Sequence, residues 1–204
     1  MSVGTKIDVS ELLGDLKFIK GSLPTTDVEA SRVIVFEFWA TWCPPCRQSI
    51  PHLSEVQAKY KSKDVFLVGV TNERNPKQIE QFVSQMGSQM DYVVALDPSN
   101  TAQEALMVPA GARGIPHAFI LDPSGVVTWQ GHPMESDFES ALSKVAAKAT
   151  SRVKFAPVTE SVEELMGKSV KELKTILQDR GVYFADCVEK GDLAKRIVER
   201  CSKV

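Results

Sequence analysis

Two hydrophobic patterns alternate along the first 150 residues of the chain. VIVFEFWA (33–40) and VFLVGV (65–70) are almost continuously apolar and rich in β-branched or aromatic side chains, which is typical of strands buried on both faces of a sheet. Between them, apolar residues recur every three or four positions, as on one face of a helix: Ile50, Leu53, Val56 and Tyr60. The pattern predicts two central strands joined by a helix from Cys46 to Tyr60, with a kink at Pro51.

The alternation of strands and helices continues to about residue 149. A Pro-Ser-Gly turn at 123–125 separates two short apolar runs, AFIL and VVTW, and predicts a hairpin. The other elements expected here are a helix over Pro76–Met86, a strand over Tyr92–Leu96, and helices over Ser99–Met107 and Asp137–Ala149. Strands that alternate with helices predict an α/β fold with a mixed, partly parallel sheet.

The last part of the chain follows a different pattern. Residues 151–160 show little periodicity and are interpreted as a linker. Ser161 and Ser169 are each followed three residues later by a glutamate, which is the signature of a helix-starting capping box. We expect one helix after Ser169 that ends at Gly181, and another over Asp192–Arg200. The net charge changes from −4 in residues 1–150 to +2 in residues 151–204, so we expect a separate small helical domain over 161–204.

Composition places the chain among soluble globular proteins. Of its 204 residues, 43% are hydrophobic and 25% are charged, and the net charge is −2, which predicts no strong attraction to nucleic acid or to an anionic membrane. No apolar run approaches the roughly 20 residues of a membrane span. The first 18 residues carry Asp8, Glu11 and Asp15 where a signal peptide would be apolar. We therefore expect a cytoplasmic protein.

The candidate chemistry is concentrated in FWATWCPPC, residues 38–46. A Cys-x-x-Cys pair can be a redox pair or half of a zinc site, but structural zinc needs four ligands. The remaining candidates form no second tight pair: Cys187, Cys201, His52, His117 and His132. In a reducing compartment two nearby cysteines are more often catalytic or metal-binding than a permanent cross-link. A redox pair is therefore the favoured interpretation, with no metal and no cofactor.

The position of the pair assigns different roles to the two cysteines. Cys43 lies between an apolar strand and a helix, so its thiolate would be stabilised by the helix N-terminus. Cys46 lies one turn inside the helix and is more shielded. This order predicts that Cys43 attacks a substrate disulfide and that Cys46 resolves the mixed disulfide. Arg47 is expected to be a solvated charge that helps to keep Cys43 ionised.

These residues resemble the active-site strand and loop of the thioredoxin superfamily. Pro51 matches the family's kink proline, and RGIPHAFILDPSG (113–125) resembles the segment with its cis-proline, here Pro116. The resemblance implies that this loop faces the cysteine pair and binds extended substrate, with Trp42, Pro44, Ile115 and Pro116 as substrate-binding residues. The strand and helix within residues 76–107 resemble the insertion of the larger redoxin branch. Peroxiredoxins carry the motif P-x-x-x-T-x-x-C around a single peroxidatic cysteine. A peroxidase is disfavoured because this chain has a tryptophan and a Cys-x-x-Cys pair instead.

Glu37 is the single acid in an otherwise apolar strand, and two interpretations remain open. It can lie at a sheet edge, where its carboxylate reaches water. Alternatively, it is buried beneath the cysteine pair with a raised pKa. Thioredoxins carry a buried aspartate six residues before the first cysteine, so the resemblance implies that Glu37 exchanges protons with Cys46. His117, which follows the predicted cis-proline, tunes the Cys43 thiolate, lines a pocket or is solvated, and these alternatives remain open.

Residues 169–197 carry a second resemblance, to the SAP-like domain of mesencephalic astrocyte-derived neurotrophic factor. Those relatives hold a Cys-x-x-Cys in the loop between two helices, whereas this chain has Phe184 in place of the first cysteine and keeps only Cys187. Many SAP modules bind DNA, but a net charge of +2 with interleaved acids is a weak electrostatic match to nucleic acid. We expect a protein partner or a stabilising role instead.

Two functions from different classes follow. The first is a thiol–disulfide oxidoreductase that reduces disulfides in proteins or small molecules and is itself reduced again by an upstream dithiol. The second is a redox-regulated adaptor or chaperone-like protein whose helical module selects partners. Turnover of a disulfide substrate distinguishes them, because an adaptor does not need to turn over.

Overall fold

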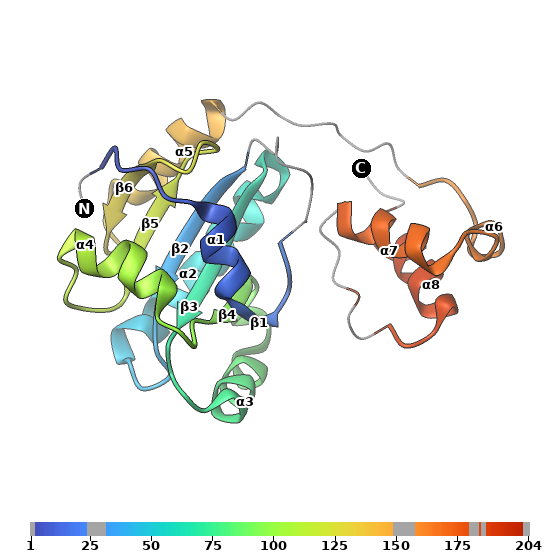
Figure 1. The fold of residues 1–204 in the computed structure, drawn as a ribbon, viewed down its shortest axis with the longest axis horizontal. Helices are drawn as coiled ribbons and strands as arrows, with labels where there is room; N and C mark the ends of the chain where they lie inside the picture. The colour runs from blue at the N-terminus through green and yellow to red at the C-terminus, as the bar shows by residue number, and fades with distance from the viewer. Residues whose placement is uncertain (1–2, 24–31, 149–157, 180–183, 185–186, 202–204) are drawn as a thin grey trace. The chain divides into compact units, whose positions relative to one another are not determined.

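The computed structural model describes residues 3–23, 32–148, 158–179, 184 and 187–201. The chain forms two compact units (Figure 1). The first comprises Met1–Lys20 and Ser31–Arg152, and the second comprises Gly21–Ala30 and Val153–Val204. No helix in the described ranges is both long and apolar enough to cross a membrane.

The first unit is built on one six-stranded sheet with the order β1-β4-β3-β2-β5-β6. Strands β2, β3 and β4 are parallel, whereas β1, β5 and β6 pair antiparallel to their neighbours. The predicted mixed α/β sheet is therefore confirmed. The strand bounds are β1 Lys17–Lys20, β2 Val33–Phe38, β3 Val65–Thr71, β4 Val93–Leu96, β5 His117–Leu121 and β6 Val127–Gly131.

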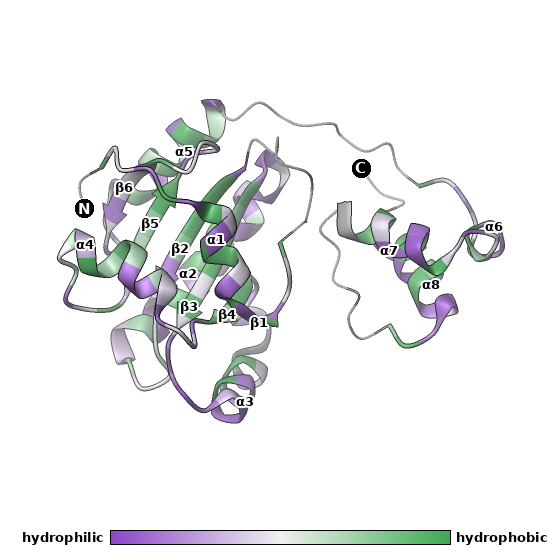
Figure 2. Cartoon of the chain, in the orientation of Figure 1, coloured by the Kyte–Doolittle hydropathy of each residue, from purple (hydrophilic) through white to green (hydrophobic). Residues whose placement is uncertain are grey.

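The central position of β2 explains its apolar sequence. Every residue of this strand is buried, because β3 pairs with one edge and β5 with the other. Val33 and Val35 face a core shared with the helix α2 (Pro44–Tyr60), and alternation turns Phe36 and Phe38 to the opposite face. Figure 2 shows β2 and β3 as mostly hydrophobic.

Besides α2, the helices of this unit are α1 Val9–Asp15, α3 Pro76–Met86, α4 Val108–Ala110 and α5 Phe138–Lys148. Helices α2, α3 and α5 begin within two residues of where the sequence places them. One expected helix differs: the segment from 103 to 107 is π-helical and continues directly into α4. Apolar residues of α2, α3 and α5 share the core on one face of the sheet, while α1 crosses the opposite, near face in Figure 1.

Helix α1 and strand β1 are elements that the sequence pattern does not predict. Asp8 caps α1 by accepting a hydrogen bond from the Glu11 N–H at 3.0 Å. Strand β1 is only four residues long, begins and ends with lysine, and pairs with β4 at the sheet edge. Short half-exposed edge strands carry little hydrophobic signal, which explains why this strand is not evident in the sequence.

The second unit contains α6 Val162–Met166, α7 Val170–Asp179 and α8 Lys190–Cys201. Both predicted capping boxes form: Glu164 accepts from the Ser161 N–H at 2.7 Å, and Glu172 accepts from the Ser169 N–H at the same distance. The predicted helix end at Gly181 lies outside the described residues. A small apolar core joins the three helices: Val158, Leu165, Leu173, Leu177, Leu193, Ala194, Ile197 and Cys201. Val158, within the stretch interpreted as a linker, thus contributes to this core.

Candidate redox-active site

A disulfide joins Cys43 and Cys46 at the start of α2, with an S–S distance of 2.07 Å. Cys43 is the N-cap of this helix, and Pro44 and Pro45 occupy its first two positions. Because prolines have no N–H, the first helical N–H is that of Cys46, and it donates to Cys43 Sγ at 3.2 Å. The sulfur of Cys43 therefore occupies the position at which a helix N-terminus stabilises negative charge.

The two cysteines differ in their access to a neighbouring cleft. Both are buried, Cys43 with 3% of its surface exposed and Cys46 with none. Cys43 nevertheless lines a cleft of about 550 Å³, together with Trp42, Pro44 and Ile115, whereas Cys46 is not part of its wall. Of the pair, only Cys43 can be approached from this cleft.

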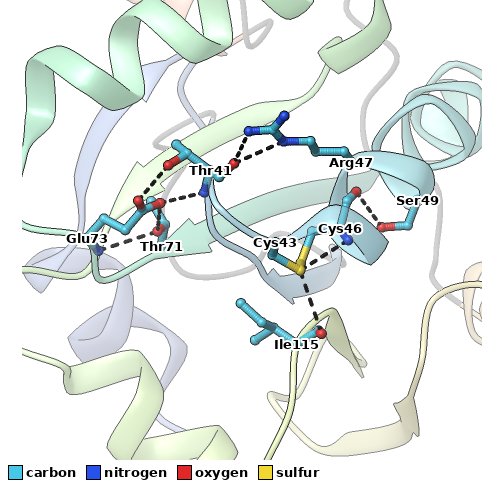
Figure 3. The surroundings of a disulfide bond; sticks show 8 residues. All are labelled: Thr41, Cys43, Cys46, Arg47, Ser49, Thr71, Glu73 and Ile115. Carbon is cyan, nitrogen blue, oxygen red and sulfur yellow. Dashed lines mark hydrogen bonds between the residues drawn. A yellow bond between two sulfur atoms is a disulfide. The ribbon is translucent and has the colours of Figure 1, made fainter.

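The loop before β5 lies against the cysteine pair. The Ile115–Pro116 peptide bond is cis, as the sequence predicts. The Ile115 carbonyl oxygen lies 3.7 Å from Cys43 Sγ (Figure 3), and Pro116 itself is buried. Trp42, with 69% of its surface exposed, and the exposed Pro44 border the same cleft. The structure therefore brings together the residues that the sequence selects for substrate contact.

A cluster around Thr41 fixes the active-site loop, and sequence reasoning missed its main member, Glu73. The Glu73 carboxylate accepts hydrogen bonds from the Thr41 N–H and hydroxyl, both at 2.7 Å, and from the Thr71 hydroxyl at 3.3 Å (Figure 3). On the other side, Arg47 donates through Nε and Nη2 to the Thr41 carbonyl oxygen. An acid two residues after a strand is common in loops, so the sequence carried no specific signal for this contact.

Arg47 and His117 each make specific side-chain contacts. Arg47 is exposed, but its guanidinium is held by the Thr41 carbonyl oxygen and lies over the Phe82 ring, 5.3 Å from the centroid. His117 is half-buried, and its Nε2 lies 3.3 Å from Gln130 Oε1. Burial lowers the pKa of His117, although the Gln130 contact opposes this effect. Burial therefore favours the neutral imidazole over the charged one.

Glu37 is fully buried in the middle of the sheet. It pairs with Gly69 of β3 on one side and with Ala118 of β5 on the other, so the alternative of a solvated edge position is wrong. Neither carboxylate oxygen has a hydrogen-bond partner among the described residues. Burial raises the pKa of Glu37 from 4.5 to about 8. The group can therefore change protonation near neutral pH.

The potential metal ligands in the described ranges do not gather into a site. No group of three or more histidine, cysteine, aspartate or glutamate side chains lies close enough together there to hold a metal ion. The chemistry supported by this arrangement is thiol–disulfide exchange, in which sulfur supplies both the nucleophile and the leaving group.

A thioredoxin-like sheet with a Cys-x-x-Cys disulfide at a helix N-terminus defines the class of thiol–disulfide oxidoreductases. Residues 19–146 match the redoxin family, and the chain belongs to that family. It is a thiol–disulfide oxidoreductase whose redox-active disulfide joins Cys43 and Cys46. Membership of this family implies disulfide-containing proteins as substrates.

Individual relatives agree with this assignment. The chain is 27% identical over 131 residues to the thiol-disulfide oxidoreductase ResA of Bacillus thuringiensis (strain Al Hakam), covering 59% of this chain and 72% of the relative. It is 30% identical over 112 residues to the thiol:disulfide interchange protein HelX of Rhodobacter capsulatus, covering 54% and 58%. Among solved structures, a protein described as a thiol:disulfide interchange protein DsbE from Chlorobium tepidum superposes with a TM-score of 0.53 at 27% identity, covering 73% of this chain and 98% of that one.

The helical unit matches a different family from the one its sequence resembles. Residues 158–200 match the E3 ubiquitin-protein ligase rififylin-like domain. The predicted resemblance to the neurotrophic-factor family is therefore wrong, whereas the prediction of a small helical unit is confirmed.

Proposed function

We propose that the protein reduces disulfides in client proteins, with Cys43 as the nucleophile and Cys46 as the resolving thiol. The observation that supports this order is the position of Cys43, which caps α2 and borders the cleft while Cys46 does neither. A thiolate at Cys43 would accept the Cys46 N–H and benefit from the helix dipole. The fully buried Cys46 is protected from external disulfides.

The first step is attack by the Cys43 thiolate on a client disulfide. A bond forms between Cys43 Sγ and one client sulfur, while the client S–S bond breaks and its second sulfur leaves as a thiolate. The exposed Trp42 and the edge of the loop at Ile115 offer apolar and backbone contacts to an extended client segment. These contacts orient the client disulfide toward Cys43, which lines the cleft.

The second step releases the client and oxidises the enzyme. The Cys46 sulfur attacks Cys43 Sγ, the client leaves as its remaining thiolate, and the Cys46 proton passes to the Glu37 carboxylate. A pKa near 8 leaves a minor fraction of Glu37 ionised at pH 7, which is sufficient for a proton acceptor. The product is the Cys43–Cys46 disulfide, and a dithiol donor must reduce it before the next turnover.

Insulin reduction tests this proposal directly. With a dithiol donor in excess, the wild-type chain should precipitate insulin B chain over many turnovers, whereas Cys43→Ser should be inactive. A redox-regulated adaptor, the alternative function, would bind partners in one redox state without this turnover. Stoichiometric reduction that stops after one equivalent would therefore favour the adaptor.

We further propose that the helical unit selects clients through protein contact. The match to a domain of a ubiquitin ligase family and the separate apolar core both suit a recognition module. Its charges are mixed along the helices, with Glu172 and Asp192 among the lysines, which argues against a nucleic-acid surface. Binding of the isolated unit to duplex DNA at two salt concentrations tests the nucleic-acid alternative, because phosphate contacts weaken steeply with salt.

A further inference from the structure

Three buried polar side chains lie in the core between the sheet and α2. They are Glu37 on β2, Trp39 just after β2, and Tyr92 just before β4. Both Glu37 oxygens, Trp39 Nε1 and the Tyr92 hydroxyl are shielded from solvent and have no hydrogen-bond partner among the described residues. Each unpaired polar atom costs free energy to bury, so this concentration of such atoms requires a common explanation.

Gly69 on β3 shows that the three side chains converge. It is the direct partner of Glu37 in the parallel pairing of β2 and β3. A Cβ at this glycine would lie 2.9 Å from Tyr92 Cε2 and 3.1 Å from Trp39 Nε1. These distances leave no room for a methyl group, so the Tyr92 ring and the indole N–H both pack closely against Gly69, beside Glu37. Cε2 adjoins the ring carbon that carries the Tyr92 hydroxyl.

The electrostatics of the cluster agree with this placement. Burial raises the pKa of Tyr92 well above its usual range, and the negative charge of Glu37 raises it further. Among the described residues, no charged group opposes the effect of burial on Glu37. The flanking strands present Gly69 and Ala118 to it. Among the described residues, Tyr92 and the two cysteines belong to the core cluster on this face of the sheet.

We propose that Tyr92 is a positioning residue for proton transfer, which holds the Glu37 carboxylate through one buried water that Trp39 Nε1 also contacts. The water accepts hydrogen bonds from the phenol and the indole and donates to the carboxylate, which satisfies all three side chains. Tyr92 keeps its own proton throughout. Through the water, the Tyr92 hydroxyl stabilises the ionised form of Glu37, which is the form that takes the proton of Cys46. This inference rests on the proposed role of Glu37 and extends it.

Release of a coloured thiol separates the two chemical steps. Reduced enzyme mixed with dithiobis(nitrobenzoate) releases one thionitrobenzoate when Cys43 forms the mixed disulfide and a second when Cys46 resolves it. Tyr92→Phe removes only the hydroxyl. We expect its second phase to slow about tenfold at pH 7, with its pH profile shifted up by about one unit, while its first phase stays unchanged.

Tyr60→Phe is the matched control. Tyr60 is a buried tyrosine at the other end of α2, with its hydroxyl 3.5 Å from the Glu139 carbonyl oxygen, so both phases should equal those of the wild type. Gly69→Ala supplies an independent test, because its methyl group would displace both donors from beside Glu37. It should reproduce the slow second phase even if Tyr92→Phe folds poorly.

The outcomes distinguish this inference from the proposed function. If Glu37→Gln slows the second phase while Tyr92→Phe and Gly69→Ala keep the wild-type pH profile, the role of Tyr92 is refuted and that of Glu37 stands. If Glu37→Gln leaves the rate of the second phase unchanged, the proposed role of Glu37 as proton acceptor is refuted, and the role of Tyr92 that rests on it is refuted too. Adding Tyr92→Phe to Glu37→Gln should cause no further slowing, and an additive effect would show that Tyr92 acts by another route.

Discussion

Cys43 and Cys46 share one disulfide but are chemically unequal. The helix N-terminus and the Cys46 N–H act on the Cys43 sulfur, and only Cys43 borders the cleft. We predict that the reduced enzyme alkylates first at Cys43, with a pKa below the usual value of about 8.5. Iodoacetamide labelling across pH, read by peptide mass spectrometry, measures this. Faster labelling of Cys46 would reverse the assigned roles.

The buried carboxyl of Glu37 should make stability depend on pH. Its pKa of about 8 in the folded chain exceeds the unfolded value of 4.5, so the unfolded state loses its proton first as pH rises. The contribution of Glu37 to the free energy of unfolding therefore decreases between pH 4.5 and pH 8, and it no longer changes above pH 8. The full loss is on the order of 5 kcal/mol by linkage.

Glu37→Gln removes this dependence, because glutamine does not ionise. We expect the variant to gain stability relative to the wild type progressively from pH 4.5 to pH 8, as measured by urea unfolding of the oxidised proteins. A parallel pH dependence in both proteins would show that Glu37 is not buried in a neutral form.

At the scale of elements, the sequence predicts those that carry a strong hydrophobic period. Strands β2 and β3, the helix α2 and the hairpin of β5 and β6 all follow from their patterns. The segment from Gln103 to Met107 was expected as an ordinary helix but is π-helical, a difference of hydrogen-bond register that apolar spacing does not encode.

The residues of the site also fall into those that the sequence predicts and those that only the tertiary structure shows. The Cys43–Cys46 pair was predictable from local sequence, and the cis bond before Pro116 was implied by the resemblance to the thioredoxin superfamily. The sheet order then showed that Glu37 is buried. Glu73 and Tyr92 were not predictable, because the residues with which they interact, Thr41 and Glu37, lie more than 30 positions away. Such contacts depend on tertiary packing, which a single sequence does not display.

Glu73 should control the stiffness of the active-site loop. Glu73→Gln replaces one acceptor oxygen with a donor, so one of the two Thr41 contacts is lost. We expect a loss of about 1–2 kcal/mol in the free energy of unfolding and slower formation of the mixed disulfide. Glu80→Gln, at an exposed position of α3, is the matched control, and an equal effect of both variants would contradict the role given to Glu73.

At the scale of the whole molecule, the chain combines a redoxin unit with a helical unit that has its own core. We predict that deleting residues 155–204 leaves insulin reduction nearly unchanged but removes one class of clients from trapping experiments. The chemistry resides in the first unit, whereas recognition is assigned to the second. Loss of all activity on truncation would mean that the redoxin unit depends on the helical unit for its fold.

The most direct test of the central claim is covalent trapping on the Cys46→Ser variant. Without the resolving thiol, client proteins should remain attached through a mixed disulfide, and mass spectrometry should locate every such bond at Cys43. Cys43→Ser should trap none. Client bonds at Cys187 or Cys201, or no covalent adduct on Cys46→Ser, would contradict exchange through the Cys43–Cys46 pair.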